Sequence, residues 1–225
     1  MTKRYDIITF DCYGTLIDWN RGIRQAFQAA ARAAGVAVEA EHVLEIYHKI
    51  EPQVQAANFR PYRAVLAEAA QRVAEDLGWV MPDAAAQGFA AGLPEWPPFA
   101  DTDAALKRLA AAGYTLGILS NVDDDLLQGT LRHFSAPIEL IVTAQQVHSY
   151  KPMHGHFVEA CKRIGEKRWL HAAQSLFHDV QPCNQLGIAV VWINRQREML
   201  PAGGPQPLDT VPSLAALADW LEETA

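Results

Sequence analysis

Cysteine, positive charge and long apolar runs are all scarce in this chain. The 225 residues include 3 cysteines, Cys12, Cys161 and Cys183, which lie far apart in the sequence. An odd number of widely spaced cysteines indicates neither a disulfide framework nor a zinc site, and it favours a reducing compartment. Apolar runs stay well short of the ~20 residues that a membrane-spanning helix needs, and the N-terminal residues show no signal-peptide pattern. We therefore expect a cytoplasmic protein that does not associate with a membrane.

The balance of charge excludes another class of partner. Lys and Arg together number 19, against 26 Asp and Glu, which gives a net charge of −7. A chain of this charge is not expected to offer a surface for nucleic acid. Half of its residues are hydrophobic and a fifth are charged, as in ordinary globular proteins. Its length suffices for one large domain, or for a core with a smaller insert.

The sequence changes its pattern about halfway along. An apolar run within residues 5–10 predicts a buried first strand. Four helix-biased segments follow, near residues 20–34, 39–56, 62–78 and 83–91. Pro94, Pro97 and Pro98 end this block, because proline cannot continue a helix.

From residue 101 onward, helices and strands alternate. The expected helices cover residues 101–112, 123–132, 153–165, a segment that begins at Pro182, and 213–223. The expected strands cover residues 115–119, 139–142, 175–177 and 188–193. This alternation is typical of a parallel sheet with helices on both faces. We therefore expect an α/β core of residues 1–17 and 95–225, interrupted after its first strand by an all-helical cap of residues 18–94.

Polar side chains follow successive strands of the expected sheet. Because the carboxyl ends of parallel strands meet at one edge, where open α/β sheets bind ligands, these side chains should lie close together. A carboxylate at such a place can act as a nucleophile. Asp123 is expected to cap the helix that follows it. The four groups are Asp11 with Thr15, Ser120 with Asn121, Lys151, and His178 with Asp179, which Gln181 and Asn184 follow.

This ordered set resembles the haloacid dehalogenase-like (HAD) hydrolase superfamily across nearly the whole chain. That family carries a nucleophilic Asp in its first motif, a Ser or Thr in its second, a Lys in its third and one or two acids in its fourth. The resemblance implies a Rossmann-like parallel-sheet core with an all-helical cap inserted after the first strand. It also implies a hydrolase.

Tyr13 decides which branch of the family the chain resembles. Phosphatases of the superfamily usually read Asp-x-Asp, and their second Asp serves as general acid and base. Residues 11–15 read Asp-Cys-Tyr-Gly-Thr instead, which looks like the L-2-haloacid dehalogenase branch. Halide leaves without a proton, and no dianionic phosphate requires Mg²⁺. The resemblance thus implies metal-independent hydrolysis of a small 2-substituted carboxylic acid, a 2-haloacid first of all, with no metal and no other cofactor.

The resemblance implies roles for the core residues. Asp11 would attack the carbon that bears the leaving group, and water would then hydrolyse the resulting ester. Thr15 would position Asp11, and Lys151 would keep Asp11 ionised because a nearby cation favours the charged carboxylate. Ser120, Asn121 and adjacent backbone N–H groups would bind the substrate carboxylate.

The fourth motif departs from the resembled branch, which typically reads Ser-x-Asn-x-x-Asp there. This chain has Asp179, Gln181 and Asn184 at the corresponding positions. We expect Asp179, together with His178, to activate the hydrolytic water. Gln181 and Asn184 are expected to contact the substrate.

The cap arginine that contacts the substrate in this branch also lacks an obvious counterpart, since residues 38–56 contain no Arg. Arg60 or Arg63 is expected to substitute for it, and Tyr13 is expected to line the substrate pocket. The implied partner is a small carboxylic acid. The resemblance leaves open whether the protein forms a homodimer.

Three other functions stay open at this point. The fourth motif and residues 192–195 also resemble dehalogenase homologues that open the strained ring of azetidine-2-carboxylate, again by displacement next to a carboxylate. A Mg²⁺-dependent phosphatase could hold its metal with Asp11 and Asp179, although Tyr13 and Asn184 count against it. A non-catalytic binding protein on the same scaffold is the third alternative.

Overall fold

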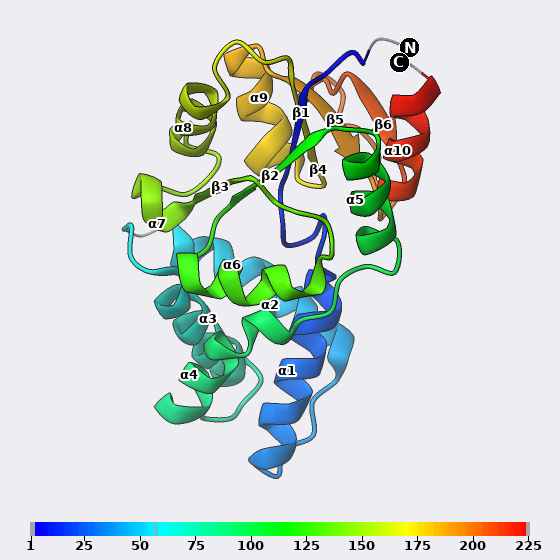
Figure 1. Ribbon diagram of the computed structural model, residues 1–225. Coiled ribbons are helices and arrows are strands. Elements are labelled where there is room, and N and C mark those ends of the chain that lie inside the picture. The colour runs from blue at the N-terminus through cyan, green and yellow to red at the C-terminus, as the bar shows by residue number, and fades with distance from the viewer. Residues whose placement is uncertain (1–2, 57, 224–225) are drawn as a thin grey trace.

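The strands form one sheet in the computed structural model, which describes residues 3–56 and 58–223. Residues 1, 2, 57, 224 and 225, which the expected domain ranges include, lie outside the described residues. The sheet has six parallel strands in the order β3-β2-β1-β4-β5-β6, so the first strand is central (Figure 1). The strands are β1 (Ile7–Phe10), β2 (Thr115–Ser120), β3 (Leu140–Thr143), β4 (Trp169–Ala173), β5 (Ala189–Ile193) and β6 (Asp209–Val211).

Helices cover both faces of this sheet. In Figure 1, α5 and α10 lie on one side of the strands, and α8 and α9 lie on the other. Successive residues of β1 point to opposite faces: Ile7 packs in the cluster that contains Phe157 of α8, and Ile8 packs in the cluster that contains Leu217 of α10. The helices of this part are α5 (Thr102–Ala111), α6 (Asp124–Thr130), α7 (Ala144–Val147), α8 (Gly155–Ile164), α9 (Gln181–Leu186) and α10 (Leu214–Glu223).

Between β1 and α5 the chain forms a separate helical layer, which we define as α1 to α4. These helices pack mainly on one another, beyond the carboxyl end of β1 (Figure 1). They are α1 (Trp19–Ala33), α2 (Ala40–Gln55), α3 (Tyr62–Asp76) and α4 (Asp83–Ala91), followed by a 3₁₀ turn at Leu93–Glu95. No helix among the described residues is both long and apolar enough to cross a membrane.

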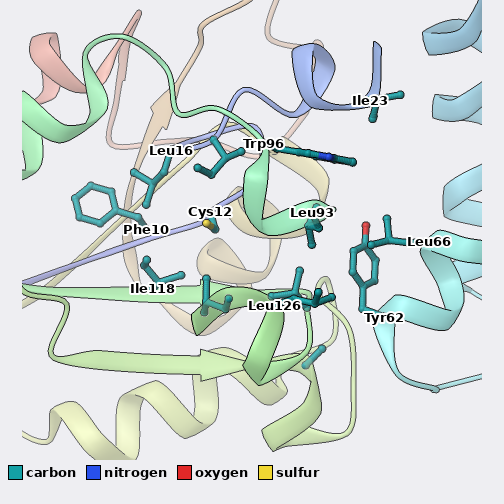
Figure 2. Packing of buried hydrophobic residues seen from close by; sticks show 14 of the residues in the cluster. Phe10, Cys12, Leu16, Ile23, Tyr62, Leu66, Leu93, Trp96, Ile118 and Leu126 are labelled. Atoms are coloured by element: carbon teal, nitrogen blue, oxygen red, sulfur yellow. The ribbon is translucent and has the colours of Figure 1, made fainter. Parts of the chain in front are cut away.

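Apolar packing joins the helical layer to the sheet. Figure 2 shows Leu93 and Trp96 between the sheet residues and Ile23 of α1, within one buried cluster. A Cβ atom on Gly22 would lie 2.4 Å from the Trp96 ring, so only glycine lets α1 approach this closely. The layer therefore sits at a fixed place beside the sheet. The domain boundaries at 17/18 and 94/95 stay a prediction.

Two details of the expected fold are wrong. Residues 175–177 are not a strand: the fourth strand is β4, at residues 169–173, and Leu176–Val180 form a turn of π-helix. The Ser175 side chain accepts the backbone N–H of His178, which starts this turn. The sequence of β4 contains a central His and two Ala residues and no β-branched residue, so it does not match the pattern that predicts a strand. The short strand β6, largely exposed, was not expected at all.

Candidate active site

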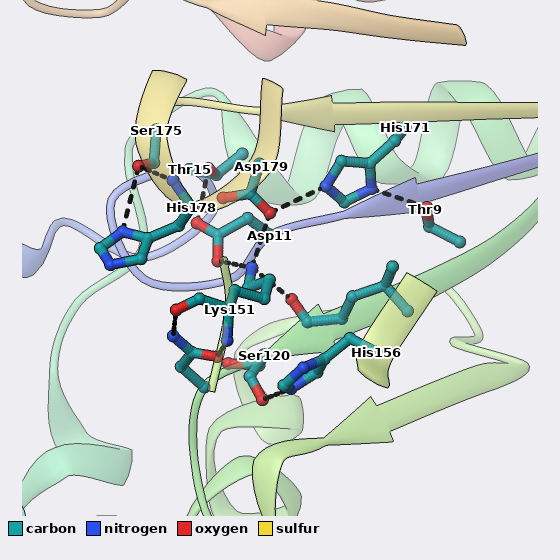
Figure 3. Close-up of polar contacts among 12 residues, drawn as sticks. Thr9, Asp11, Thr15, Ser120, Lys151, His156, His171, Ser175, His178 and Asp179 are labelled. Carbon is teal, nitrogen blue, oxygen red and sulfur yellow. Dashed lines mark hydrogen bonds and ion pairs between the residues drawn. The ribbon is translucent and has the colours of Figure 1, made fainter. Parts of the chain in front are cut away.

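Lys151 stands at the centre of the candidate site. Its Nζ donates hydrogen bonds to Asp11 Oδ1 at 2.8 Å, to Asp179 Oδ1 at 2.7 Å and to the carbonyl of Leu119 at 2.9 Å (Figure 3). These three acceptors match the three hydrogens of the ammonium group. Burial alone would lower the pKa of Lys151, but the two carboxylates outweigh it and hold that pKa above its usual value. The buried lysine is therefore charged.

The turn after β1 fixes the orientation of Asp11. Thr15 Oγ1 donates to Asp11 Oδ2 at 2.8 Å, and it accepts the backbone N–H of Gln174 at 2.9 Å. Gly14 has φ of 97°, in the region that favours glycine, which lets the chain turn back here. Each oxygen of Asp11 thus has one partner within the protein, and the carboxylate still borders the cavity described below.

Asp179 lies on the π-helical turn, fully buried. Its Oδ1 accepts from Lys151 and makes a hydrogen bond of 3.0 Å with His171 Nε2. Its Oδ2 is buried without a partner among the described residues. Burial would raise the pKa of Asp179, but Lys151 and His171 outweigh this effect and lower the pKa. Asp179 is therefore ionised, and it shares the charge of Lys151 with Asp11.

A chain of hydrogen bonds behind Asp179 orients His171. Trp169 Nε1 donates to Thr9 Oγ1 at 2.7 Å. Thr9 Oγ1 in turn lies 2.8 Å from His171 Nδ1, as Figure 3 shows. In neutral His171, Thr9 donates its own hydrogen to Nδ1, which leaves the ring hydrogen on Nε2. That hydrogen points at Asp179. The sheet interior thus supplies a donor to the buried carboxylate.

Ser120 is the last residue of β2 and Asn121 follows it, and the structure gives them different tasks. The hydroxyl of Ser120 is buried without a partner among the described residues, and Ser120 borders the cavity. The Asn121 amide instead accepts the N–H of Lys151 at 2.7 Å and donates to the carbonyl of the same residue at 3.1 Å. Asn121 therefore holds the loop that carries Lys151, while the Ser120 hydroxyl is available to a ligand.

His178 borders the cavity from the π-helical turn. Its Nδ1 and the Ser175 hydroxyl are 3.1 Å apart, and the same hydroxyl accepts the backbone N–H of His178. Burial lowers the pKa of His178 below its usual value. The imidazole is therefore neutral at pH 7, the form in which a ring nitrogen can accept a proton.

The Tyr13 hydroxyl is used within the protein. Thr130 Oγ1 donates to the carbonyl of Leu126 at 3.1 Å, so its 2.8 Å hydrogen bond with Tyr13 has Tyr13 as the donor. Burial raises the pKa of Tyr13 well above its usual value. Its ring borders the cavity and packs edge-on against Trp19 at 5.7 Å between ring centroids. Tyr13 thus forms an apolar part of the wall.

These residues line one cavity of about 530 Å³ between the sheet and the helical layer. Seven of the residues singled out in the sequence lie on its wall: Asp11, Tyr13, Ser120, Asn121, Lys151, His178 and Asp179. Thr15 acts from behind Asp11. Among the described residues there is no group of three or more His, Cys, Asp or Glu side chains arranged to hold a metal ion.

Four expected contacts are not supported by the placement of their residues. Arg60 forms an ion pair with Glu68 and Arg63 one with Asp125, each at 2.5 Å, and both arginines border a hollow separate from the cavity that holds Asp11. Gln181 and Asn184 are not on the wall of the cavity that holds Asp11. The α9 helix directs the Asn184 amide to the backbone of Gln206 instead, at 2.7 Å and 2.9 Å.

Sequence reasoning missed the residues that face the core from the helical layer. Arg24 of α1 borders the cavity, as do His48, Glu51 and Gln55 of α2. The last three follow one another at intervals of three and four residues, which places them on one face of a helix. This spacing was the available signal. Arg195, after β5, borders the cavity too, paired with Asp101 at 3.0 Å.

The fold and the site together define a capped α/β protein with an aspartate–lysine centre at the carboxyl edge of its sheet. The family model of haloacid dehalogenase-like hydrolases matches residues 5–175, and the chain belongs to this family.

Relatives of known name and structure match along nearly the whole chain. It is 27% identical to the (S)-2-haloacid dehalogenase of Pseudomonas putida, with 97% of both chains covered, and 26% identical to that of Pseudomonas fluorescens, with 94% of both covered. The L-2-haloacid dehalogenase from Xanthobacter autotrophicus with chloropropionic acid covalently bound superimposes with a TM-score of 0.83. That match covers 98% of this chain and 100% of the other at 18% identity, so it shows the shared fold.

Proposed function

We propose that the protein hydrolyses a small 2-haloacid by way of a covalent ester on Asp11. The contact between Lys151 and Asp11 at 2.8 Å carries this proposal, because it holds the carboxylate of Asp11 against a buried ammonium group at the cavity wall. The names of the relatives support the substrate class. Tyr13 supports it as well, since a halide needs no proton donor beside the nucleophile.

The first step is a displacement at carbon. A carboxylate oxygen of Asp11 bonds to C2 of the substrate, and the carbon–halogen bond breaks with its electron pair leaving on the halide. Ser120 binds the substrate carboxylate with its free hydroxyl. Arg24, which borders the cavity from the helical layer, takes the part expected of Arg60 or Arg63 and attracts the departing halide.

The second step hydrolyses the ester. Water adds to the carbonyl carbon of Asp11 while the neutral imidazole of His178 takes one of its protons. The acyl C–O bond then breaks, and the product oxygen takes up the second proton. His178 suits the role of base better than Asp179, whose carboxylate is stabilised in its ionised form by Lys151 and His171.

The donor set counts against the phosphatase alternative. A divalent cation held by Asp11 and Asp179 would need carboxylate oxygens that point at a common place. Lys151 Nζ already takes that place, at 2.8 Å and 2.7 Å from one oxygen of each. The ammonium thus occupies one oxygen of each carboxylate that a metal would use, which supports hydrolysis without a metal.

Halide release tests the function directly. Purified protein should release halide from L-2-chloropropionate in buffer with EDTA, above the uncatalysed background. Asp11→Asn should abolish this release, because an amide is no nucleophile. During turnover in H₂¹⁸O the label should enter Asp11, as hydrolysis at its carbonyl demands. Release that EDTA abolishes, or that survives in Asp11→Asn, would contradict the proposal.

A further inference from the structure

Glu51 of α2 places a carboxyl group on the wall of the cavity that the helical layer forms. Its Oε1 accepts the hydroxyl hydrogen of Tyr62 at 2.9 Å and a hydrogen of Gln55 Nε2 at 3.3 Å. Its Oε2 has no hydrogen bond to any described residue, although the side chain is partly buried. One oxygen of Glu51 is therefore held in place, and the other is available to a ligand.

Each cation on the cavity wall already has a carboxylate other than Glu51. Arg24 Nη1 contacts Glu41 at 2.8 Å, Arg195 contacts Asp101 at 3.0 Å, and Lys151 lies between Asp11 and Asp179. No Lys, Arg or His among the described residues forms an ion pair with Glu51. A carboxylate that is partly buried without a cation lacks the partner that such groups usually have.

The size of the cavity also indicates a larger substrate. Its volume of about 530 Å³ lies within the range of pockets that enclose drug-sized ligands. An acid as small as 2-chloropropionate would leave most of this space unfilled. A substrate that fits the cavity carries a further group, which extends from Asp11 towards α2.

We propose that Glu51 binds a protonated amine on the substrate. The substrate class is then a 2-substituted carboxylic acid whose side chain ends in an ammonium group. The inference rests on the proposed chemistry of Asp11 and specifies its substrate. The acid end of such a molecule meets Ser120 at the core, and the ammonium end meets the free oxygen of Glu51.

The electrostatics of the pocket give this contact a pH dependence. Burial raises the pKa of Glu51 to about 7, against the lowering effect of the hydrogen bond from Tyr62. An ammonium group favours ionised Glu51, so the preference for a cationic substrate should grow from pH 6 to pH 8. The titratable groups near Glu51 are Tyr47 and His48 on its own helix, Tyr62 of α3 and Tyr150. The charged and titratable groups elsewhere on the cavity wall are Arg24, Asp18, Arg195, Glu198, and the cluster of Asp11, Lys151, His178 and Asp179.

A matched pair of substrates tests the proposal. In 2-chloro-4-aminobutyrate the chain ends in an ammonium group, and in 2-chloropentanoate a methyl group takes its place. Halide release should show a higher kcat/KM for the amine, by about tenfold or more, as for a hydrogen bond between charged groups. Glu51→Gln keeps the acceptor for Tyr62 and should remove this preference. Glu45→Gln, an exposed change on the same helix, should leave it intact.

The outcomes separate this inference from the proposed function. Absence of halide release from both substrates and from 2-chloropropionate would overturn the proposed function itself. Release from both at equal kcat/KM in the unchanged protein would overturn only the role of Glu51. A preference that persists in Glu51→Gln would assign ammonium binding to another residue and would overturn the proposal as well. Thermal melting of the variants, expected to match the parent within a few degrees, confirms that they fold.

Discussion

Asp123 caps the first turn of α3 by accepting the N–H of Tyr62 on Oδ1 at 2.7 Å, and Oδ2 takes the next N–H, of Arg63, at 2.9 Å. The sequence suggested instead that Asp123 caps the helix that follows it, α6, but no such side-chain contact exists there. The loop that follows Ser120, the last residue of β2, is thereby tied to the helix that carries Tyr62. Because Tyr62 also donates to Glu51, one aspartate links the two walls of the cavity.

Removing this cap should loosen the helical layer. In Asp123→Ala, two backbone N–H groups at the start of α3 lose their acceptor, and the free energy of unfolding should fall by about 1–2 kcal/mol. KM should rise more than kcat falls, since Tyr62 and Glu51 lose their fixed position. Urea denaturation and steady-state kinetics measure both effects. Asp125→Ala is the control: it removes only an exposed ion pair to Arg63 and should cost under about 1 kcal/mol.

Lys151 is predicted to stabilise the folded protein and also to be required for turnover. Lys151→Met leaves the carboxylates of Asp11 and Asp179 buried without their cation, which should lower the free energy of unfolding by about 3–5 kcal/mol and abolish turnover. Adding Asp179→Asn removes one of the two stranded charges, so the double variant should regain part of the stability but no activity. Denaturation curves of the parent, of Lys151→Met and of the double variant measure these differences in stability. A single variant as stable as the parent would contradict the ion-pair account.

Tyr13 should tolerate loss of its hydroxyl. Because that hydroxyl donates to Thr130 and not into the cavity, Tyr13→Phe should keep halide release within a few-fold of the parent. The lost hydrogen bond should cost about 1 kcal/mol of stability. A fall in kcat of a hundredfold or more, with the fold intact by circular dichroism, would give the hydroxyl a direct part in catalysis and contradict its assignment to the wall.

The core half of the site could be predicted because topology alone brings it together. Parallel strands end at one edge, so Asp11, Ser120 and Lys151 meet wherever the alternation of helix and strand is recognised. Asp179 joined them although its strand was placed six residues too late, because the turn after β4 still ends at that edge.

The helical half of the site could not be predicted in the same way. Which residues of α1 and α2 face the sheet depends on how these helices pack across the chain, for example on the close approach of Gly22 and Trp96. Arg60 and Arg63 matched the expected residue type, but they border a separate hollow and form ion pairs with Glu68 and Asp125. Glu51 and Arg24 lie on the cavity wall, but no sequence motif indicates this placement.

His156, buried beneath Ser120, predicts how stability depends on pH. Its Nε2 lies 3.0 Å from the Ser120 carbonyl, which can only accept, so the neutral ring carries its hydrogen there. Burial lowers the pKa of His156 from 6.5 to about 3 in the folded protein. As pH falls below 6.5 the unfolded chain binds a proton that the folded chain does not, so stability decreases until pH approaches 3.

The size of this effect follows from the difference in pKa. Between pH 6.5 and pH 5 the contribution of His156 should reach about 2 kcal/mol. In His156→Gln, whose amide can still donate to the Ser120 carbonyl, the decrease in stability over this range should be smaller by that amount. Urea denaturation of both proteins at the two pH values measures it, with the exposed change His42→Gln as the control. An identical decrease in all three proteins would show that His156 takes up its proton without unfolding, and its buried place beneath Ser120 would then not keep it neutral.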